Sequence, residues 1–232
     1  MSNLNNIGPL SIISYFSFTL IFFIIKSKIG LGRGITWIIV FFMITGIIQF
    51  MNNVYLTSLM CGNTNMPSAF FNTLIPWILI FGSSILMLIL IPGWVRVFSN
   101  TFGFMVAQWA GLNEIVANLF KPMNEIDPKT DLNLQKTIEI IAGNPSKIIN
   151  EVNLNDYSVV NKDGVEIVSW PSLDLLTPYM KQSVPSDKKT ELYNLLVLKE
   201  DIGYFVWFIL IGSISILVST NSVLISKCSG PV

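Results

Sequence analysis

The side chains that most often carry out catalysis are scarce or scattered in this sequence. Histidine, the usual general base and metal ligand near neutral pH, does not occur. Asp127 with Asp131, and Glu200 with Asp201, are spaced for acid–base work, but no pocket-forming motif surrounds either pair. We interpret these four as solvated or helix-capping charges. The sequence therefore predicts no enzyme, with no catalytic residue, metal site, cofactor or small-molecule substrate.

Two further features suggest binding chemistry only at first sight. The glycine-rich run from Gly30 to Gly34 follows no strand and precedes no Lys-Ser/Thr pair, so we interpret it as a turn and not a phosphate loop. Cys61 and Cys228 are too few for a zinc cluster and allow a single disulfide. Both a disulfide and two free thiols are compatible with the sequence.

Charge and hydrophobicity divide the chain into membrane-like and water-like parts. Apolar residues make up 52% of the sequence and charged residues 12%, and all fourteen acids lie between Glu114 and Asp201. Four uncharged apolar runs are long enough to cross a bilayer. We predict a mainly α membrane protein, with three transmembrane helices in residues 1–95 (7–25, 35–51 and 74–91), a fourth at 202–226 and a tail at 227–232.

A small soluble α+β domain is expected at residues 96–201, inserted between the third and fourth transmembrane helices. From Val97 to Asp201 there are nine lysines and fourteen acids, an excess of five negative charges that argues against nucleic acid as a partner. Asn161-Lys162-Asp163-Gly164 lies between two β-branched runs and predicts a hairpin near 157–169. Helices are expected over 131–142, 146–152, 172–182 and 186–199, the last able to continue into the fourth span.

Residues 94–120 have apolar side chains at helical spacing with Asn and Gln between them. This pattern fits a helix lying in the membrane interface, and it fits a helix in the core of the soluble domain equally well.

Positive and aromatic residues suggest how the helices are oriented. The short loop at 26–34 carries Lys26, Lys28 and Arg33, and Arg96 follows the third span, so the positive-inside rule predicts that both sites are cytoplasmic. Cys61 and Cys228 then share the opposite face, which makes a disulfide between them a hypothesis. The candidate interfacial anchors are Trp77, Trp94, Tyr204 and Trp207.

Small residues recur along the third and fourth spans and favour close helix packing: Gly82, Gly212, Ser215 and Ser219. The same residue types could line a pore, with Gln49 and Asn221 as further polar candidates. Because none of the four runs contains a charge, a pump or coupled transporter is not expected.

Several short sequence strings occur together in the second part of the chain: Pro92-Gly93-Trp94, Phe98–Gly103, Gly143–Ser146, Ile149-Asn150-Glu151 and Lys199–Asp201, with Trp207, Gly212, Asn221 and Cys228. Together they resemble a family of virion membrane proteins of large nucleocytoplasmic DNA viruses, the mimivirus and phycodnavirus-like groups. The similarity covers residues 92–228, whereas Ser219-Thr220-Asn221 departs from the aromatic-containing version of that family.

The resemblance implies a structural role as a minor capsid protein in the internal membrane of a giant-virus virion. The expected partners are the lipid bilayer, major and minor capsid proteins, and further copies of the chain. During assembly in membrane derived from the host endoplasmic reticulum, the soluble domain would face the cytoplasm and the capsid. The candidate partner-facing residues are Phe98, Asn100, Phe102 and Trp170. The alternatives are a viroporin-like channel and a membrane-assembly factor that does not enter the virion.

Overall fold

The computed structural model describes residues 7–29, 34–91, 93–121, 149–150, 152–162, 165–181, 184–226 and 228. The chain divides into two compact units. We call Met1–Arg96 together with Tyr204–Val232 the bundle unit, and Val97–Gly203 the hairpin unit. The long helix α11 (Ser186–Ile225) contributes its first part to the hairpin unit and its second part to the bundle unit.

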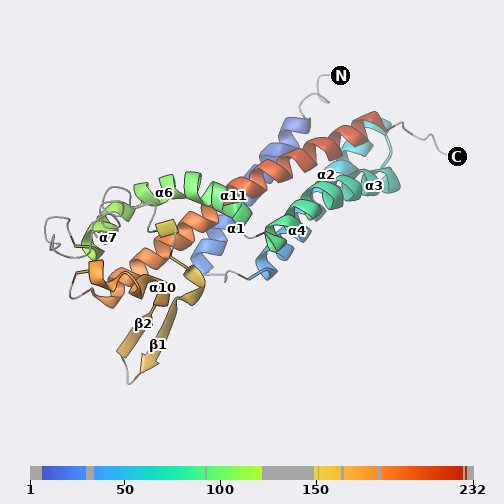
Figure 1. Cartoon of the computed structure of the whole chain (residues 1–232). Helices are drawn as coiled ribbons and strands as arrows, with labels where there is room; N and C mark the ends of the chain where they lie inside the picture. The colour runs from blue at the N-terminus through green and yellow to red at the C-terminus, as the bar shows by residue number, and fades with distance from the viewer. Residues whose placement is uncertain are drawn as a thin grey trace. The chain divides into compact units, whose positions relative to one another are not determined.

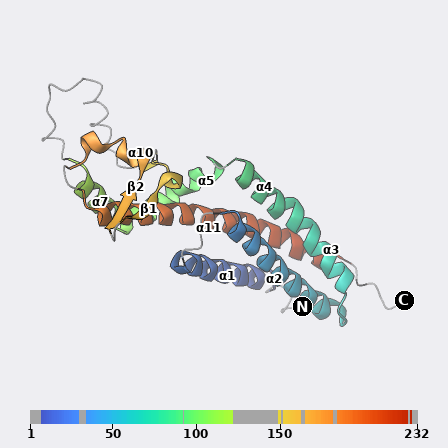
Figure 2. The same cartoon turned by 90° about the horizontal axis from the view of Figure 1, so that it is seen from below.

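The bundle unit is a layer of helices lying side by side (Figures 1 and 2). Its helices are α1 (Ile7–Ile29), α2 (Thr36–Cys61), α3 (Met66–Pro76), the π-helical turn η2 (Trp77–Gly82), α4 (Ser83–Leu90) and the end of α11. Among the described residues, four helices are long and apolar enough to cross a membrane: Pro9–Ile29, Thr36–Cys61, Met66–Leu90 and Ser186–Ile225. Only 28–39% of each apolar window is buried inside the chain, so most of this apolar surface faces outward, as lipid contact requires.

The helices of the bundle unit are longer than the apolar runs that predict them. α1 continues past residue 25 through Lys26 and Lys28, whose positive charges are favourable in the last turn of a helix. α2 continues past residue 51 through Asn52 and Asn53. Asparagine is accommodated there because Asn53 is buried and hydrogen-bonded inside the bundle. α2 ends at Gly62, whose φ of +69° is a left-handed conformation that glycine adopts readily.

The third span covers Met66–Leu90 instead of the predicted 74–91, because Pro76 does not end the helix. Proline has no N–H to donate and its ring crowds the carbonyl four residues earlier, so a helix must widen or bend around it. Here the helix widens into η2, which begins directly after Pro76. Ser84 supports this turn by donating a hydrogen bond to the carbonyl oxygen of Ile80 at 2.6 Å.

Aromatic rings fill the centre of the bundle unit. Phe41 of α2, Phe81 of η2 and Phe208 of α11 are fully buried, with centroids 5.0 Å apart for Phe41–Phe208 and 5.7 Å for Phe81–Phe208. The hydroxyl of Tyr15 in α1 joins this cluster by donating to the carbonyl oxygen of Phe208 at 2.6 Å. Gly212 makes room for the tyrosine, since a Cβ atom there would collide with its hydroxyl. Such aromatic pairs add about 0.5–1.5 kcal/mol each beyond the area they bury.

The hairpin unit is built from short elements packed against the first part of α11. They are α5 (Gly93–Phe98, shared with the bundle unit), η3 (Ser99–Gly103), α6 (Phe104–Trp109), α7 (Leu112–Leu119), η5 (Leu154–Asp156), β1 (Ser158–Lys162), β2 (Val165–Ser169), α10 (Pro171–Asp174) and η6 (Thr177–Tyr179). β1 and β2 pair in antiparallel register, as the turn sequence predicts. α11 begins at Ser186 and runs without a break into the fourth apolar run.

Two of the helices predicted for this unit differ in the structure, and two others lie wholly or mostly outside the described residues. The single helix expected over 94–120 is interrupted at Gly111, whose φ of +99° redirects the chain before α7. The helix expected over 172–182 is reduced to α10 and η6, with Pro178 at the start of η6. The helix expected over 131–142, and most of that over 146–152, lie outside the described residues.

The core of the hairpin unit joins α6, α7, α10 and α11. Its fully buried side chains are Ala107, Leu112, Leu119, Trp170 and Leu173. The chain on either side of Phe120 and Met180 pairs as an isolated antiparallel bridge, which ties the end of α7 to the end of η6. This core supports both ends of the β-hairpin.

η3 and α11 approach each other so closely that only glycine fits at the contact. A Cβ atom on Gly103 would overlap the backbone carbonyl of Lys199, and one on Gly203 would lie 2.8 Å from the backbone nitrogen of Ser99. Ser99, Gly103 and Ala107 are all buried, which is the small-residue spacing that allows two helix backbones to meet.

We expect Gly103→Ala to destabilise the protein by about 1–3 kcal/mol, because the new methyl group must displace helix backbone. Helix propensity alone predicts the opposite sign, since alanine is favoured over glycine by about 1 kcal/mol. Gly93→Ala is the matched control, because nothing lies within 4 Å of a Cβ atom built there. The measurement is the thermal unfolding midpoint of the purified protein in detergent, and equal midpoints for the two variants would contradict the packing argument.

Candidate functional site

The β-hairpin is anchored at its base by aromatic side chains. Tyr157 precedes β1 and Trp170 follows β2, and their ring centroids lie 5.3 Å apart. Tyr157 also stacks on Tyr193 of α11 at 3.8 Å, and its hydroxyl is 3.0 Å from that of Thr190. The indole N–H of Trp170 donates to the carbonyl oxygen of Asn153 at 2.8 Å. The two ends of the hairpin are therefore held on α11.

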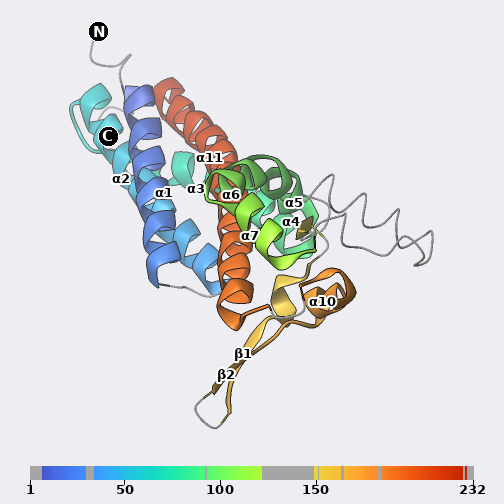
Figure 3. The same ribbon diagram turned by 90° about the vertical axis from the view of Figure 1, so that its left-hand side faces the viewer.

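The two strands beyond this base expose apolar side chains. Val159, Val160 and Ile167 are exposed by 47%, 53% and 48%, and Val160 lies directly opposite Ile167 in the register. Within the described part of the chain the sheet has two strands, and the hairpin projects from the other elements of its unit (Figures 1 and 3). Isolated hairpins are at best marginally stable in water, and exposed β-branched edges are surfaces that other chains pair with.

The residues expected to face a partner have different environments in the hairpin unit. Trp170 does not offer a binding surface, because it is fully buried and its ring is used to fix the hairpin. Phe98 and Asn100 are half-buried, and Asn100 accepts a hydrogen bond from the ammonium of Lys199 at 2.8 Å. Phe102 is 48% exposed. Phe102 is thus the most accessible of the four. The sequence does not identify the strand residues Val160 and Ile167 as exposed, because the alternation of side chains along a strand does not show which face of the sheet is covered.

Lys199 is buried and donates hydrogen bonds to the side-chain oxygens of both Asn100 and Asn150. A buried ammonium has to be surrounded by acceptors, because leaving it without them costs several kcal/mol. Its role is therefore to join η3, the segment at Asn150 and α11 within the hairpin unit.

A hydrogen-bonded polar cluster lies inside the bundle unit. The side-chain amide of Asn53 in α2 donates to the hydroxyls of Thr73 in α3 and Ser219 in α11, at 2.7 Å in both cases. Gln49 donates to the side-chain oxygen of Asn53 at 3.2 Å and to the hydroxyl of Thr220 at 3.3 Å. At most 4% of each of these five residues is exposed. We call these residues the polar cluster; it links three helices.

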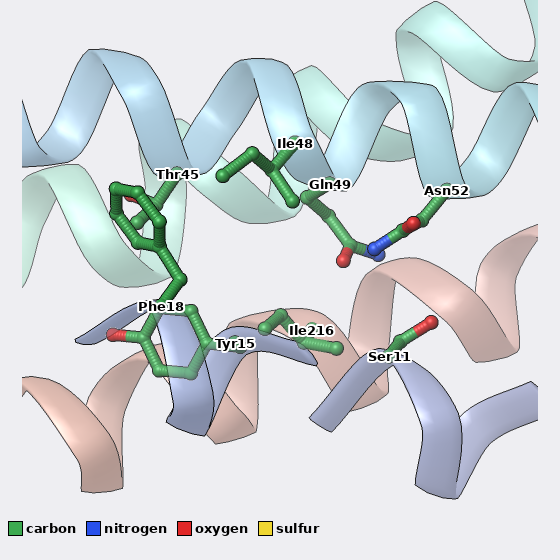
Figure 4. A pocket seen from close by; sticks show the side chains of 8 residues that line it. All are labelled: Ser11, Tyr15, Phe18, Thr45, Ile48, Gln49, Asn52 and Ile216. Carbon is green, nitrogen blue, oxygen red and sulfur yellow. The ribbon is translucent and has the colours of Figure 1, made fainter. Parts of the chain in front are cut away.

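Next to the polar cluster, the side-chain oxygen of Gln49 is buried and accepts no hydrogen bond from the residues that the structure describes. A cavity of about 10 Å³, close to the size of one water molecule, is lined by Gln49 together with Ser11, Tyr15 and Ile216. Figure 4 shows the Gln49 side chain reaching from α2 toward α1 and α11, where this cavity lies. Its volume is far below that of a continuous water-filled passage.

Gln49 and Asn221, the two candidate pore residues, do not share a lumen. Gln49 is 1% exposed within the polar cluster, whereas Asn221 lies on the exposed side of α11. Of the small residues predicted to pack helices, Gly212, Ser215 and Ser219 are buried within the bundle unit. A Cβ atom built on Gly82 would make only ordinary contacts, with the carbonyl oxygen of Trp77 and the ring of Phe42, so close packing does not require glycine there.

The predicted interfacial aromatic residues fall into two groups. Trp77 and Trp207 are buried inside the bundle unit at 4% and 7% exposure, and the Trp77 indole donates to the carbonyl oxygen of Phe42 at 3.3 Å. Trp94 is 40% exposed and its ring lies 5.8 Å from that of Trp207, while Tyr204 is half-buried. Trp77 and Trp207 therefore stabilise helix packing, and Trp94 keeps the exposure that an interfacial anchor needs.

A disulfide joins Cys61 at the end of α2 to Cys228 after the end of α11, with a Cα–Cα distance of 5.5 Å. The positive-inside rule predicts, independently of this bond, that the two cysteines lie on one face of the membrane. The bond closes a loop over a sequence separation of 167 residues. It lies close in sequence to the side chains of Ser68 and Ser226, whose hydroxyls are 3.3 Å apart.

A second concave surface of the bundle unit is an apolar groove of about 390 Å³ between α2 and the α3–η2 segment. Phe42, Ile47, Trp77 and Ile78 are among the residues that line it. Its hydroxyl group, on Thr73, is already bonded to Asn53 and to the carbonyl oxygen of Ala69. The lining of the groove is therefore predominantly apolar.

No group of three or more potential metal-ligating His, Cys, Asp or Glu side chains occurs among the residues that the structure describes. Comparison of the chain with protein-family models, curated proteins and solved structures gives no match. The function proposed below therefore depends on the residues and geometry given above and on the resemblance of residues 92–228.

We expect Asn53→Leu to lower the stability of the bundle by about 1–2 kcal/mol, because it removes three interhelical or intrahelical bonds that average roughly 0.6 kcal/mol each in membrane proteins. Asn221→Leu is the control, since the side chain of Asn221 is exposed. Thermal midpoints in detergent measure both effects. A variant at Asn53 that is as stable as the variant at Asn221 would mean that the polar cluster does not hold the helices together.

We expect the oxidised protein to lose about 2–4 kcal/mol of stability on reduction, because the disulfide restricts the unfolded chain. Cys61→Ser and Cys228→Ser should each show the reduced midpoint under both conditions. The measurement pairs thermal unfolding with thiol labelling before and after a reductant. Free thiols in the untreated protein, with no effect of reductant, would contradict this disulfide.

Proposed function

We propose that this chain is a structural integral membrane protein of a virion with an internal membrane, as the resemblance of residues 92–228 implies. The bundle unit anchors the chain in the bilayer, and the hairpin unit binds a capsid protein. The observation that carries the proposal is the hairpin, with its base fixed in a packed core and apolar strand residues left exposed.

The geometry of the hairpin supports protein as the class of partner. No other described strand pairs with the edges of this two-stranded sheet, and a strand of another protein can pair there while its side chains contact Val160 and Ile167. The acidic excess of residues 97–201 disfavours nucleic acid and anionic lipid as the principal partner. A capsid protein rich in β-strands would satisfy these requirements.

The interior of the bundle unit supports an anchor more than a channel. A channel places polar side chains along a shared lumen, whereas the polar side chains of this bundle bond to one another. The neighbouring cavity holds about one water molecule. In liposomes containing the purified protein we therefore expect no ion flux above that of protein-free liposomes.

The proposal predicts that a hairpin variant loses its capsid partner while remaining folded and inserted. In particles or in co-expressing cells, Val160→Asp combined with Ile167→Asp should reduce co-purification of capsid protein at least about tenfold, because a buried carboxylate without a partner is costly at an interface. Leu175→Asp is the control, because Leu175 is 79% exposed and lies outside the hairpin.

Mass spectrometry of purified particles and protease protection complete this test. We expect the chain in particles, with Lys162 and Lys26 on the same side of the membrane. Absence from particles would favour a membrane-assembly factor, flux in liposomes would favour a channel, and unchanged co-purification of the hairpin variant would reject the hairpin as the binding element.

A further inference from the structure

The segment α5–η3–α6 has an exposed apolar face that the proposed capsid contact does not use. The exposed fractions are 63% for Val97, 48% for Phe102, 41% for Met105 and 77% for Trp109. We call these four residues the outer face. From Val97 to Asn113 the sequence contains no charged residue. Single exposed apolar residues are common on soluble proteins, but four on one uncharged helical segment form a surface that water disfavours.

The helix cannot turn to bury its outer face within its own unit. Its opposite side carries Ser99, Gly103 and Ala107, which are buried. Gly103 touches the backbone of Lys199, and Ser99 lies against Gly203, so any rotation would drive a larger side chain into α11. The outer face is therefore fixed in its exposed position by the packing of the inner side.

Chain connectivity keeps this segment close to the membrane surface, given the membrane insertion proposed above. The third span ends at Leu90, α5 begins at Gly93, and the outer face begins at Val97. Two linking residues, which make three Cα–Cα steps, and one turn of helix reach roughly 17 Å at most. The inner side of the segment packs on Lys199 and Gly203, at the start of the fourth apolar run. Both attachments therefore come from the ends of spans.

We propose that the outer face lies in the interfacial layer of the lipid bilayer, with Trp109 and Met105 at the boundary between headgroups and acyl chains. Burial of apolar surface holds it there, not attraction to anionic headgroups, because the segment has no lysine or arginine between Val97 and Asn113. The exposed hydroxyl of Thr101 is compatible with this layer, because it already donates a hydrogen bond to the carbonyl oxygen of Val97 at 2.8 Å. Tryptophan is the residue type most typical of this depth.

This inference assigns Phe102 to lipid and not to a protein partner. Of the four residues that sequence reasoning expected to face a capsid protein, Trp170 is in the core and Phe102 belongs to the membrane-facing set. The hairpin remains as the protein-binding surface of the unit. The two surfaces use different residues and can be tested separately.

The experiment places an environment-sensitive fluorophore on single introduced cysteines of the full-length protein. Trp109→Cys and Met105→Cys report on the outer face, and Leu175→Cys is the control, because Leu175 and Trp109 are almost equally exposed at 79% and 77%. Cys61 and Cys228 are joined as a disulfide and do not react with the label. The labelled proteins are reconstituted at one copy per nanodisc, in zwitterionic lipid with or without a doxyl group near the headgroup.

We expect the label at position 109 or 105 to be quenched at least about twofold by the doxyl lipid, while the label at position 175 stays unquenched. Anionic lipid or high salt should leave the quenching unchanged. Labels at 109 and 105 that behave like the label at 175 would overturn the proposal. Shielding that develops only when several copies share one vesicle would also overturn it, in favour of a second copy as the occupant.

Failure of membrane insertion gives a different result from failure of this inference. Flotation of the protein with liposomes after alkaline carbonate washing reports on the four spans alone. A protein that floats but shows no quenching at 109 and 105 keeps the proposed anchor and rejects the interfacial face. A protein that does not float rejects the proposed function itself.

Discussion

An amide or hydroxyl carried into the interior of an apolar helix bundle has to find its hydrogen-bond partner inside that bundle, because hydrocarbon offers none. In the bundle unit this constraint is met at Asn53, which bonds to Thr73 and Ser219 on two other helices. The bonds determine how α2, α3 and α11 are rotated about their axes, since each polar side chain must point to the same interior place. Tyr15 fixes α1 in the same way through the carbonyl oxygen of Phe208. The aromatic packing around Phe41 and Phe208 then follows from these rotations.

The same constraint explains which parts of the structure the sequence predicts. A stretch without charge from Gly34 to Val95 predicts apolar spans, because a charge at the centre of a span costs about 2.5–3.5 kcal/mol. The described part of the chain contains four helices that could cross a membrane. The turn Asn161–Gly164 predicts the β1–β2 hairpin, since it is a local signal that needs no knowledge of the rest of the chain. Local turn signals and the absence of charge are therefore sufficient to predict the number and type of these elements.

Sequence reasoning failed where a residue's role depends on a neighbour far along the chain. The second span is predicted to end at residue 51, but the helix continues through Asn53, which is hydrogen-bonded to helices that the sequence does not show to be adjacent. The third span is predicted over 74–91, but the helix begins at Met66 and passes Pro76 through a π-helical turn that has no sequence signature. Trp170 was expected on the surface, although a tryptophan after a strand is equally suited to anchor that strand. In each case the residues that surround the side chain in the fold, and not its own type, determine its conformation and burial.

The hairpin unit exposes two surfaces of different chemistry, because different side chains are buried beneath each of them. The close approach of η3 and α6 to α11 buries Ser99, Gly103 and Ala107. The α5–η3–α6 segment therefore exposes its uncharged outer face. The aromatic residues of the hairpin pack at its base. The strands beyond the base expose β-branched side chains and backbone hydrogen-bonding groups. An uncharged helical face can lie against lipid, which supplies no hydrogen bonds, whereas an exposed strand edge can pair with a strand of another polypeptide. The two surfaces of the hairpin unit therefore differ in the partner that we propose for each: lipid for the outer face and a capsid protein for the strands.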